Sequence, residues 1–371
     1  MANLELHSKI TLNDEDFDLL FENTSYYEYP NETNGCCSLP PCTVYKIQAF
    51  DKIFLPVFYT LVFLLGLFGN LVVMAVMLRY KHTLTSTETF ILHLAIADIL
   101  LVLTLPFWAV QAVLGWIFGD VFCKIIGSVF KINFYSSIFL LVCISFDRYL
   151  SIVHAVKMYK KHKTLLVHMS CLAVWGFCCL LTIPDLMFLQ SVNEIRFNTI
   201  ECLHNFSSNT ARYWRATIRF LFHVVGFFLP LCVMVYCCSR IILTLLGSQG
   251  FQKHKDMRII IAVVLTFILC WAPYNVVILT DTLVSFNVLN QNCDLDTQID
   301  IGKSITSSLG YFYCCLKPFL YVFIGIKFRD NLLMLLNQIG CIGNKFMKKY
   351  LTPEQRNSTW SESGERTSSA L

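Results

Sequence analysis

Seven apolar segments, each of about 20 residues, divide this chain of 371 residues. They cover residues 54–78, 89–111, 125–146, 165–184, 220–239, 259–280 and 304–325. A helix of that length crosses roughly 30 Å of hydrocarbon and satisfies every backbone N–H and C=O group there. The composition, 56% hydrophobic and 15% charged, excludes an ordinary soluble domain. We therefore predict an all-α membrane protein, a bundle of seven transmembrane helices.

Lys and Arg gather in the loops after the first, third and fifth segments. The basic residues of these loops are Arg79, Lys81, Lys157, Lys160, Lys161, Lys163, Arg240, Lys253, Lys255 and Arg258. The third outer loop, taken as residues 281–300, carries Asp281, Asp294, Asp296 and Asp300 and neither Lys nor Arg. Because cytoplasmic loops collect positive charge, we predict an extracellular amino terminus and a cytoplasmic carboxyl terminus. An odd number of spans requires the two termini to lie on opposite sides of the membrane, which agrees with this orientation.

The chain is predicted to have four parts. Residues 1–50 form an acidic extracellular segment and residues 51–326 the seven-transmembrane bundle. Residues 327–340 place apolar side chains on one helical face, which predicts a short amphipathic eighth helix at the membrane surface. Residues 341–371 form a cytoplasmic tail rich in Ser and Thr.

The amino-terminal segment has a strong excess of negative charge. Eight acidic residues (Glu5, Asp14, Glu15, Asp16, Asp18, Glu22, Glu28, Glu32) stand against Lys9 and Lys46. One interpretation is a solvated, disordered tail; the other is a capture arm that steers a basic ligand. Tyr26, Tyr27 and Tyr29 lie among these acids, in a setting that suits tyrosine sulfation and further negative charge.

Glycosylation sequons lie on predicted extracellular segments. Asn23 and Asn31 begin two of them in the amino-terminal segment, and Asn205 begins a third in the second outer loop. A fourth sequon, at Asn357, falls in the cytoplasmic tail and is read as accidental.

Cysteines on the extracellular side suggest two disulfides. Cys123 begins the third span and Cys202 lies in the second outer loop, so a bridge between them would hold that loop over the bundle. Cys42 and Cys293 suggest a second bridge, between the amino-terminal segment and the seventh helix. Cys36 and Cys37 remain unassigned, because adjacent cysteines rarely pair with each other.

Of the Asp, Glu, Lys and Arg residues, three lie within the spans: Asp98, Lys131 and Lys317. A charge within a membrane is costly, so an ionisable residue there indicates a functional site.

Several short motifs occur in order along the spans. They are Gly69-Asn70, Leu94-Ala95-Ile96-Ala97-Asp98, Asp147-Arg148-Tyr149, Trp175, Pro230 and Cys270-Trp271-Ala272-Pro273. Together they resemble the rhodopsin-like (class A) G-protein-coupled receptors. The resemblance implies that Asp147 holds Arg148 in the inactive state and releases it toward a G protein, with Tyr149 and Trp271 in the switch.

A second set of runs narrows the resemblance to the chemokine receptors. It comprises Thr104-Leu105-Pro106-Phe107-Trp108, Trp116-Ile117-Phe118-Gly119, the run from Asp147 to Ala155, and the four outer cysteines. A third set looks most like the CXC class of these receptors: Cys36-Cys37-Ser38-Leu39-Pro40-Pro41-Cys42, Ile132-Asn133-Phe134-Tyr135, Ser145-Phe146-Asp147, Ala173-Val174-Trp175-Gly176 and Ser358-Thr359-Trp360-Ser361-Glu362. The resemblance implies a plasma-membrane receptor for basic CXC chemokines in the immune response. It also implies chemotactic signalling through inhibitory-type heterotrimeric G proteins, with receptor kinases and arrestin acting on the tail.

The family also implies where the ligand's cationic amino terminus would bind. Acids at the outer mouth, Asp185, Asp281 and Asp300, are candidate partners, with Trp108, Phe130, Tyr274 and Trp271 on the floor of the site. Core packing is the alternative for Phe130 and Trp271, and solvation at a helix end is the alternative for Asp185.

The seventh span departs from the family pattern. The family's Asn-Pro-x-x-Tyr motif reads here Lys317-Pro318-Phe319-Leu320-Tyr321. Asp98, Asn133 and Ser137 match the polar cluster that holds a sodium ion in inactive rhodopsin-like receptors. We predict that the Lys317 ammonium replaces that ion as a tethered cation paired with Asp98, because an unpaired buried charge is costly. The alternative is that Lys317 extends to the cytoplasmic interface.

A second departure lies eight residues after Pro230, where Cys238 replaces the Tyr usual in the family. Lys317 and Cys238 leave two interpretations open: a signalling receptor, favoured by Asp147-Arg148-Tyr149, or a scavenger that internalises chemokine without G-protein activation. The sequence has no catalytic constellation, phosphate-binding loop or metal-spaced cluster, so we predict neither an enzyme nor a cofactor or metal site, and no nucleic-acid partner.

Overall fold

The computed structural model describes residues 45–154, 163–194, 199–207, 210–246, 251–290 and 292–351. These residues all belong to one compact unit, Cys42–Leu371. Several predictions concern residues outside the described ones: those for Asn23, Tyr26, Tyr27, Tyr29, Asn31, Cys36, Cys37 and Cys42, and those for the tail beyond residue 351.

Among the described residues, seven helices are long and apolar enough to cross a membrane, as the sequence predicts. They span Asp51–Arg79, Ser86–Leu114, Gly119–His154, Thr164–Phe188, Ala211–Leu246, Arg258–Ser285 and Cys293–Ile324. Each extends past its apolar segment at one end or both, because backbone hydrogen bonding continues into polar flanks that the hydrophobic pattern does not mark. The prediction of an all-α bundle of seven transmembrane helices is confirmed.

The elements follow one another along the chain in this order: α2 (Tyr45–Arg79), η1 (Lys81–Thr83), α3 (Ser86–Val102), α4 (Leu105–Leu114), α5 (Gly119–Tyr149), η2 (Leu150–His154), α7 (Lys163–Phe188), β1 (Leu189–Glu194), β2 (Thr199–His204), α8 (Ala211–Phe220), η3 (Leu221–Phe228), α9 (Leu229–Leu246), α10 (Phe251–Ser285), α11 (Cys293–Ile324), α12 (Ile326–Gln338) and α13 (Asn344–Tyr350). The second span thus combines α3 and α4, and the fifth combines α8, η3 and α9.

Local chemistry explains where these helices begin and bend. Thr85 and Glu88 form a reciprocal capping box at the start of α3. Between α3 and α4, Pro106 has no N–H to continue the ladder, and the Thr104 hydroxyl donates to the Leu101 carbonyl at 2.6 Å. In the fifth span the π-helical segment η3 ends just before Pro230, where the same missing donor interrupts regular pairing.

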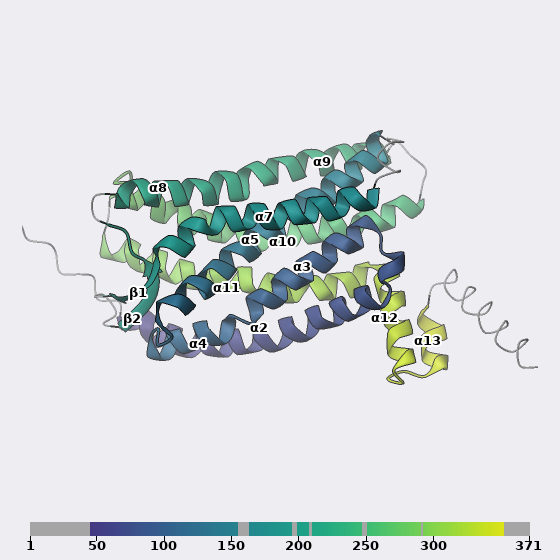
Figure 1. Cartoon of the computed structure of the whole chain (residues 1–371), viewed down its shortest axis with the longest axis horizontal. Helices are drawn as coiled ribbons and strands as arrows, with labels where there is room; N and C mark the ends of the chain where they lie inside the picture. The colour runs from purple at the N-terminus through teal and green to yellow at the C-terminus, as the bar shows by residue number, and fades with distance from the viewer. Residues whose placement is uncertain are drawn as a thin grey trace, which may run out of the picture. The chain divides into compact units, whose positions relative to one another are not determined.

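The second outer loop, between α7 and α8, contains an antiparallel hairpin of β1 and β2. Ser191 faces Cys202 in its register, and Leu189 faces His204. No strand was predicted here, because the segment is short and lacks a clear alternation of apolar and polar residues. The hairpin lies at one end of the bundle, which we call the hairpin end (Figure 1).

The packing of the bundle is that of a membrane protein. Its core includes Phe134, Phe222, Phe267 and Trp271, which are at most 1% exposed. The outer faces carry large exposed apolar side chains, such as Phe68 at 72% and Phe323 at 79%. Exposure on this scale matches a surface that faces lipid rather than water.

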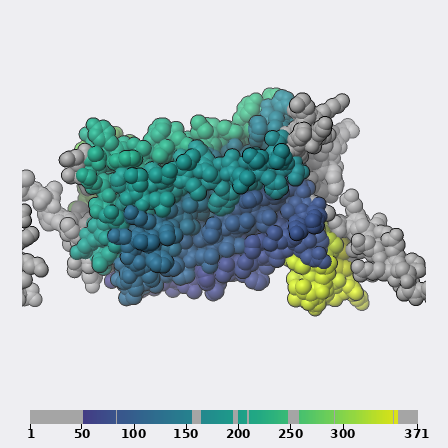
Figure 2. Space-filling model, in the orientation of Figure 1, coloured from purple at the N-terminus to yellow at the C-terminus, as the bar shows by residue number. Residues whose placement is uncertain are grey.

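Beyond the seventh span lie α12 and α13, drawn in yellow at the end opposite the hairpin (Figure 2). Arg148, near the end of α5, lines a small cavity here together with Lys327 and Phe328 of α12, and we call this end the Arg148 end. The structure has a helix at Ile326–Gln338, and the amphipathic eighth helix at the membrane surface, expected over residues 327–340, stays a prediction.

Candidate functional site

A cavity of about 580 Å³ lies at the hairpin end, between the helices and β2. Its lining includes Trp108, Phe130, Asp185, Tyr274 and Asp281, all predicted to contact a ligand. Asp300 lines instead a neighbouring cavity of about 250 Å³, with Trp108 common to both. The larger cavity falls in the size range of ligand sites and combines aromatic walls with a few polar groups, as such sites do.

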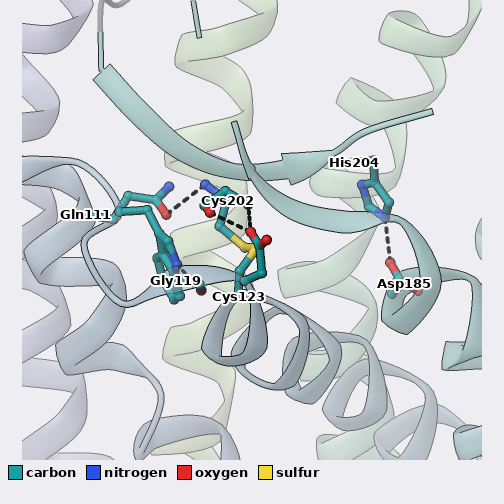
Figure 3. The surroundings of a disulfide bond; sticks show 9 residues. Gln111, Gly119, Cys123, Asp185, Cys202 and His204 are labelled. Atoms are coloured by element: carbon teal, nitrogen blue, oxygen red, sulfur yellow. Dashed lines mark hydrogen bonds and ion pairs between the residues drawn. A yellow bond between two sulfur atoms is a disulfide. The ribbon is translucent and has the colours of Figure 1, made fainter. Parts of the chain in front are cut away.

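The hairpin is fixed over this end by covalent and polar contacts. Cys123 of α5 forms a disulfide with Cys202 of β2, as the sequence suggests (Figure 3). The Ser191 backbone N–H and hydroxyl donate to Asp120 Oδ1 at 2.8 and 2.5 Å. Cys293 is also disulfide-bonded, and Cys42, its predicted partner, lies outside the described residues.

The acids predicted to meet a cationic ligand already have basic partners. Asp185, 3% exposed, contacts the His204 ring nitrogen Nε2 at 2.9 Å (Figure 3). Asp281 binds two cations: one carboxylate oxygen lies 2.5 Å from Arg219 Nη2 and the other 2.9 Å from Lys303 Nζ. Lys303 also reaches Asp300, at 3.4 Å.

Arg219 and Lys303 were missed by the sequence analysis, although signals for both are present. Arg212, Arg215 and Arg219 recur at spacings of three and four, which places them on neighbouring positions of one helix. Lys303 follows Asp300 by three residues, which makes the two neighbours on α11.

The aromatic floor separates into cavity wall and core. Phe130 lines the cavity, and its ring centroid lies 5.8 Å from that of Trp271 and 6.1 Å from that of Tyr274. Trp271 is fully buried below them and is not among the described lining residues, so it belongs to the core beneath the cavity. It packs against Phe134 at 4.7 Å between centroids.

A buried charged cluster lies deeper in the bundle. Lys317 Nζ donates to Asp98 Oδ1 at 2.7 Å, and the Asn133 amide donates to the same oxygen at 3.1 Å. The Lys317 ammonium also lies 4.5 Å from the Tyr313 ring centroid. The predicted Lys317–Asp98 pair is therefore present. Lys317 does not extend to the cytoplasmic interface, which was the alternative. Ser137 is buried too, and its hydroxyl has no hydrogen-bond partner within the described part of the chain.

At the Arg148 end, the guanidinium is bound mainly by a threonine. Arg148 donates from Nε and Nη2 to the Thr87 hydroxyl at 2.9 and 2.5 Å, whereas Nε lies 3.9 Å from Asp147 Oδ2. Thr87 was not predicted, because a lone threonine has no distinctive sequence signal. The Tyr149 hydroxyl contacts the His154 ring at 2.8 Å.

Tyr321 and Pro318 pack close to the same end. Tyr321 is buried and stacks edge-on against Phe328 of α12, with 6.1 Å between centroids. Pro318 lies against Gly69, where an added Cβ would be 3.0 Å from its ring. Lys327 of α12 forms an ion pair with Glu88 of α3 at 2.9 Å.

Two further predictions concern modification and metals. Asn205 is exposed just after β2 and its amide donates to Gln190 at 3.0 Å; glycosylation there stays a prediction. Within the described ranges, no group of three or more His, Cys, Asp or Glu side chains has the arrangement of a metal site.

Comparison with protein families matches residues 69–321 to the seven-transmembrane receptors of the rhodopsin family. The C-X-C chemokine receptor type 3 of Homo sapiens is 46% identical over 370 residues, which cover 99% of this chain and 100% of the relative. The type 3 receptor of Bos taurus is 47% identical over 356 residues, 96% of each chain. The C-X-C chemokine receptor type 5 of Mus musculus is 39% identical over 366 residues, 97% of this chain and 96% of the relative. The resemblance stated from the motifs is confirmed, and none of these relatives is an enzyme.

Proposed function

The chain belongs to the C-X-C chemokine receptors, within the rhodopsin family of seven-transmembrane receptors, and from this premise we propose that it binds basic CXC chemokines at the hairpin end and activates an inhibitory-type G protein at the Arg148 end. As a multi-pass protein of the plasma membrane, it has its hairpin end outside the cell and its Arg148 end in the cytoplasm in this proposal.

The observation that carries the proposal is the position of two sites at opposite ends of one helix. Cys123, which fixes the hairpin, and Arg148 both belong to α5. At 1.5 Å per residue, they lie about 37 Å apart, which is the thickness of a membrane with part of its interfaces. A ligand in the cavity and a protein bound at Arg148 would thus act on the same helix from opposite sides of the bilayer.

Ligand capture would begin outside the bundle. The eight acids of residues 1–50, with sulfated Tyr26, Tyr27 and Tyr29, would attract a basic chemokine and raise its rate of association. The chemokine's flexible amino-terminal segment would then enter the cavity of about 580 Å³.

Activation would shift the bundle between two states. In the proposed inactive state Arg148 is held by Thr87 and Asp147, and the active state exposes it to the G protein as α10 moves outward. Receptor kinases would then phosphorylate the Ser/Thr-rich tail, and the added charge would recruit arrestin.

The alternative candidate is a scavenger that internalises chemokine without activating a G protein. The buried Lys317–Asp98 pair favours it, because a charge pair in the core resists the separation of α3 and α11 that switching would require. The intact Asp147-Arg148-Tyr149 favours the signalling receptor.

Chemokine-stimulated G-protein activation distinguishes the two candidates. The native chain and Lys317→Asn, expressed at matched surface level, would be exposed to a panel of CXC chemokines. Activation by the native chain establishes the signalling receptor. Uptake without activation, with signalling gained in Lys317→Asn, establishes the scavenger. The absence of both binding and activation for every chemokine would refute the proposed function.

A further inference from the structure

The larger cavity at the hairpin end has more basic than acidic groups in its described lining. The basic side chains are Lys131, Arg215, Arg219 and Lys303, and the acidic ones are Asp185 and Asp281. This balance is the opposite of what a site for a cationic group requires.

The two acids are also engaged. Asp185 contacts His204, and Asp281 binds both Arg219 and Lys303. A cation entering the cavity would have to displace these partners, whereas an anion would find positive charge in excess.

Among these basic groups, Arg219 and Lys303 bind Asp281. Arg215 is exposed to solvent, whereas Lys131 is only partly exposed. It lies in the third span, and its ammonium is 4.1 Å from the centroid of the Phe222 ring. It has no hydrogen bond and no ion pair with any described residue, although Asp185 and Arg219 act on it electrostatically. A cation–π contact offsets only part of the cost of placing an ammonium within a membrane protein.

Trp108 adds a second donor that lacks an acceptor. Its indole Nε1 is buried and has no hydrogen-bond partner within the described ranges, and its ring lines the same cavity. A donor left without an acceptor is costly. The cavity is therefore rich in donors and poor in acceptors, which is the deficit that a ligand's carboxylate would fill.

We propose that Lys131 is a specificity-determining residue that binds a carboxylate of an Asp or Glu side chain in the entering segment of the ligand. This inference rests on the proposed function, since it requires a protein ligand whose segment reaches the cavity. The carboxylate would accept a hydrogen bond from Lys131 Nζ and neutralise the ammonium, which already makes a cation–π contact with the Phe222 ring.

The test measures chemokine affinity on intact cells that express the full chain at matched surface level. The probe is a labelled CXC chemokine that binds the native chain, together with versions in which each Asp or Glu before its first Cys is changed to the amide. The receptor variants are Lys131→Gln, Lys131→Arg and, as control, Lys124→Gln. Lys124 lies on the same helix, and it is not among the described residues that line the cavity.

We expect Lys131→Gln to weaken binding of the unmodified chemokine by about tenfold or more, and Lys131→Arg and Lys124→Gln to change it little. For one amide version of the chemokine, the native chain and Lys131→Gln should bind equally, because the carboxylate that Lys131 recognises is missing.

Two results would overturn the anion site while leaving the proposed function intact. One is equal binding of the unmodified chemokine to the native chain and Lys131→Gln. The other is a loss in Lys131→Gln that persists for every amide version, which would show that Lys131 acts without a ligand carboxylate. If no chemokine binds the native chain, the proposed function fails and the anion site fails with it.

Discussion

Lys317 donates a hydrogen bond to Asp98 at 2.7 Å, and the two side chains are 0% and 1% exposed. The pair joins α11 to α3 in the interior of the bundle, 219 residues apart in the sequence. Asn133 donates to the same carboxylate oxygen, so three helices converge on one acceptor. A buried pair of this kind contributes little net stability relative to apolar packing, yet the loss of one partner is costly.

Removal of one partner of this pair should destabilise the protein strongly. Asp98→Asn leaves the Lys317 ammonium without its counter-ion, and Lys317→Asn does the same to the Asp98 carboxylate. Each variant should lose about 3–5 kcal/mol, seen as a lower midpoint of thermal unfolding of the purified receptor in detergent. The double variant Asp98→Asn with Lys317→Asn should have a higher midpoint of thermal unfolding than either single variant, because no uncompensated charge remains.

The matched control is Lys327→Gln. Lys327 also pairs with an acid of α3, Glu88, at 2.9 Å, but its side chain is 45% exposed. Its loss should cost no more than about 1 kcal/mol. Equal midpoints for Lys317→Asn and Lys327→Gln would contradict the importance assigned to the buried pair.

Sodium should affect the stability of the protein only after Lys317 is removed. If the ammonium replaces the ion, exchange of NaCl for KCl at equal concentration should leave the unfolding midpoint of the native chain unchanged. In Lys317→Asn the Asp98 carboxylate, with Asn133 beside it, becomes available to sodium, and NaCl should raise the midpoint, since a ligand that binds the folded state stabilises it.

The double variant Asp98→Asn with Lys317→Asn serves as the control, because it lacks the carboxylate and should not respond to sodium. A sodium response in the native chain would refute the tethered cation. So would the absence of any response in Lys317→Asn.

Much of the fold could be predicted because a bilayer restricts what a chain can do. Seven apolar segments require seven helices. The extracellular positions of Cys123, at the start of the third span, and Cys202, in the second outer loop, suggested the disulfide between them. The Lys317–Asp98 pair could be predicted for a similar reason: a buried lysine requires an acid, and Asp98 was the acid at that depth.

The predictions fell short where several partners were equally plausible. Asp185 and Asp281 were expected to bind a cationic ligand. Asp185 instead contacts His204, and Asp281 binds Arg219 and Lys303. Near helix ends many charges lie at similar depth, and only the three-dimensional arrangement of side chains selects among them. Arg148 illustrates the same limit, because its partner Thr87 lies 61 residues away on another helix.

Thr87 should restrain Arg148, so Thr87→Ala should raise G-protein activation in the absence of ligand. The substitution removes the hydroxyl that accepts bonds from Arg148 Nε and Nη2, while the ion pair with Asp147, whose Oδ2 lies 3.9 Å from Nε, remains. Hydrogen bonds from a charged group contribute about 1.5–3 kcal/mol, so ligand-free activity should rise severalfold at matched surface level.

Thr87→Ser and Thr89→Ala are the controls. The serine keeps the hydroxyl, and Thr89 lies on the same helix with its own hydroxyl bonded to the Thr85 carbonyl instead. Both should retain the native level of ligand-free activity. A rise in Thr89→Ala equal to that in Thr87→Ala would assign the effect to the helix rather than to the contact with Arg148.

Gly310 should be required for the position of Trp271. A Cβ at residue 310 would lie 2.9 Å from Trp271 Cη2 and 3.1 Å from Cζ3, and Trp271 is fully buried against Phe134. Gly310→Ala should therefore push the indole out of its packing and cost about 1–3 kcal/mol, measured as a lower midpoint of thermal unfolding.

Gly176→Ala provides the comparison, because an added Cβ there meets nothing within 4 Å and the residue also lies within a helix. Alanine has the higher helix propensity, so this variant should be as stable as the native chain or slightly more so. The double variant Gly310→Ala with Trp271→Phe tests the cause: the smaller ring gives the methyl group room, so it should recover part of the stability lost in Gly310→Ala. If the loss is the same with either ring at residue 271, the close approach of Gly310 to Trp271 is not what makes glycine necessary.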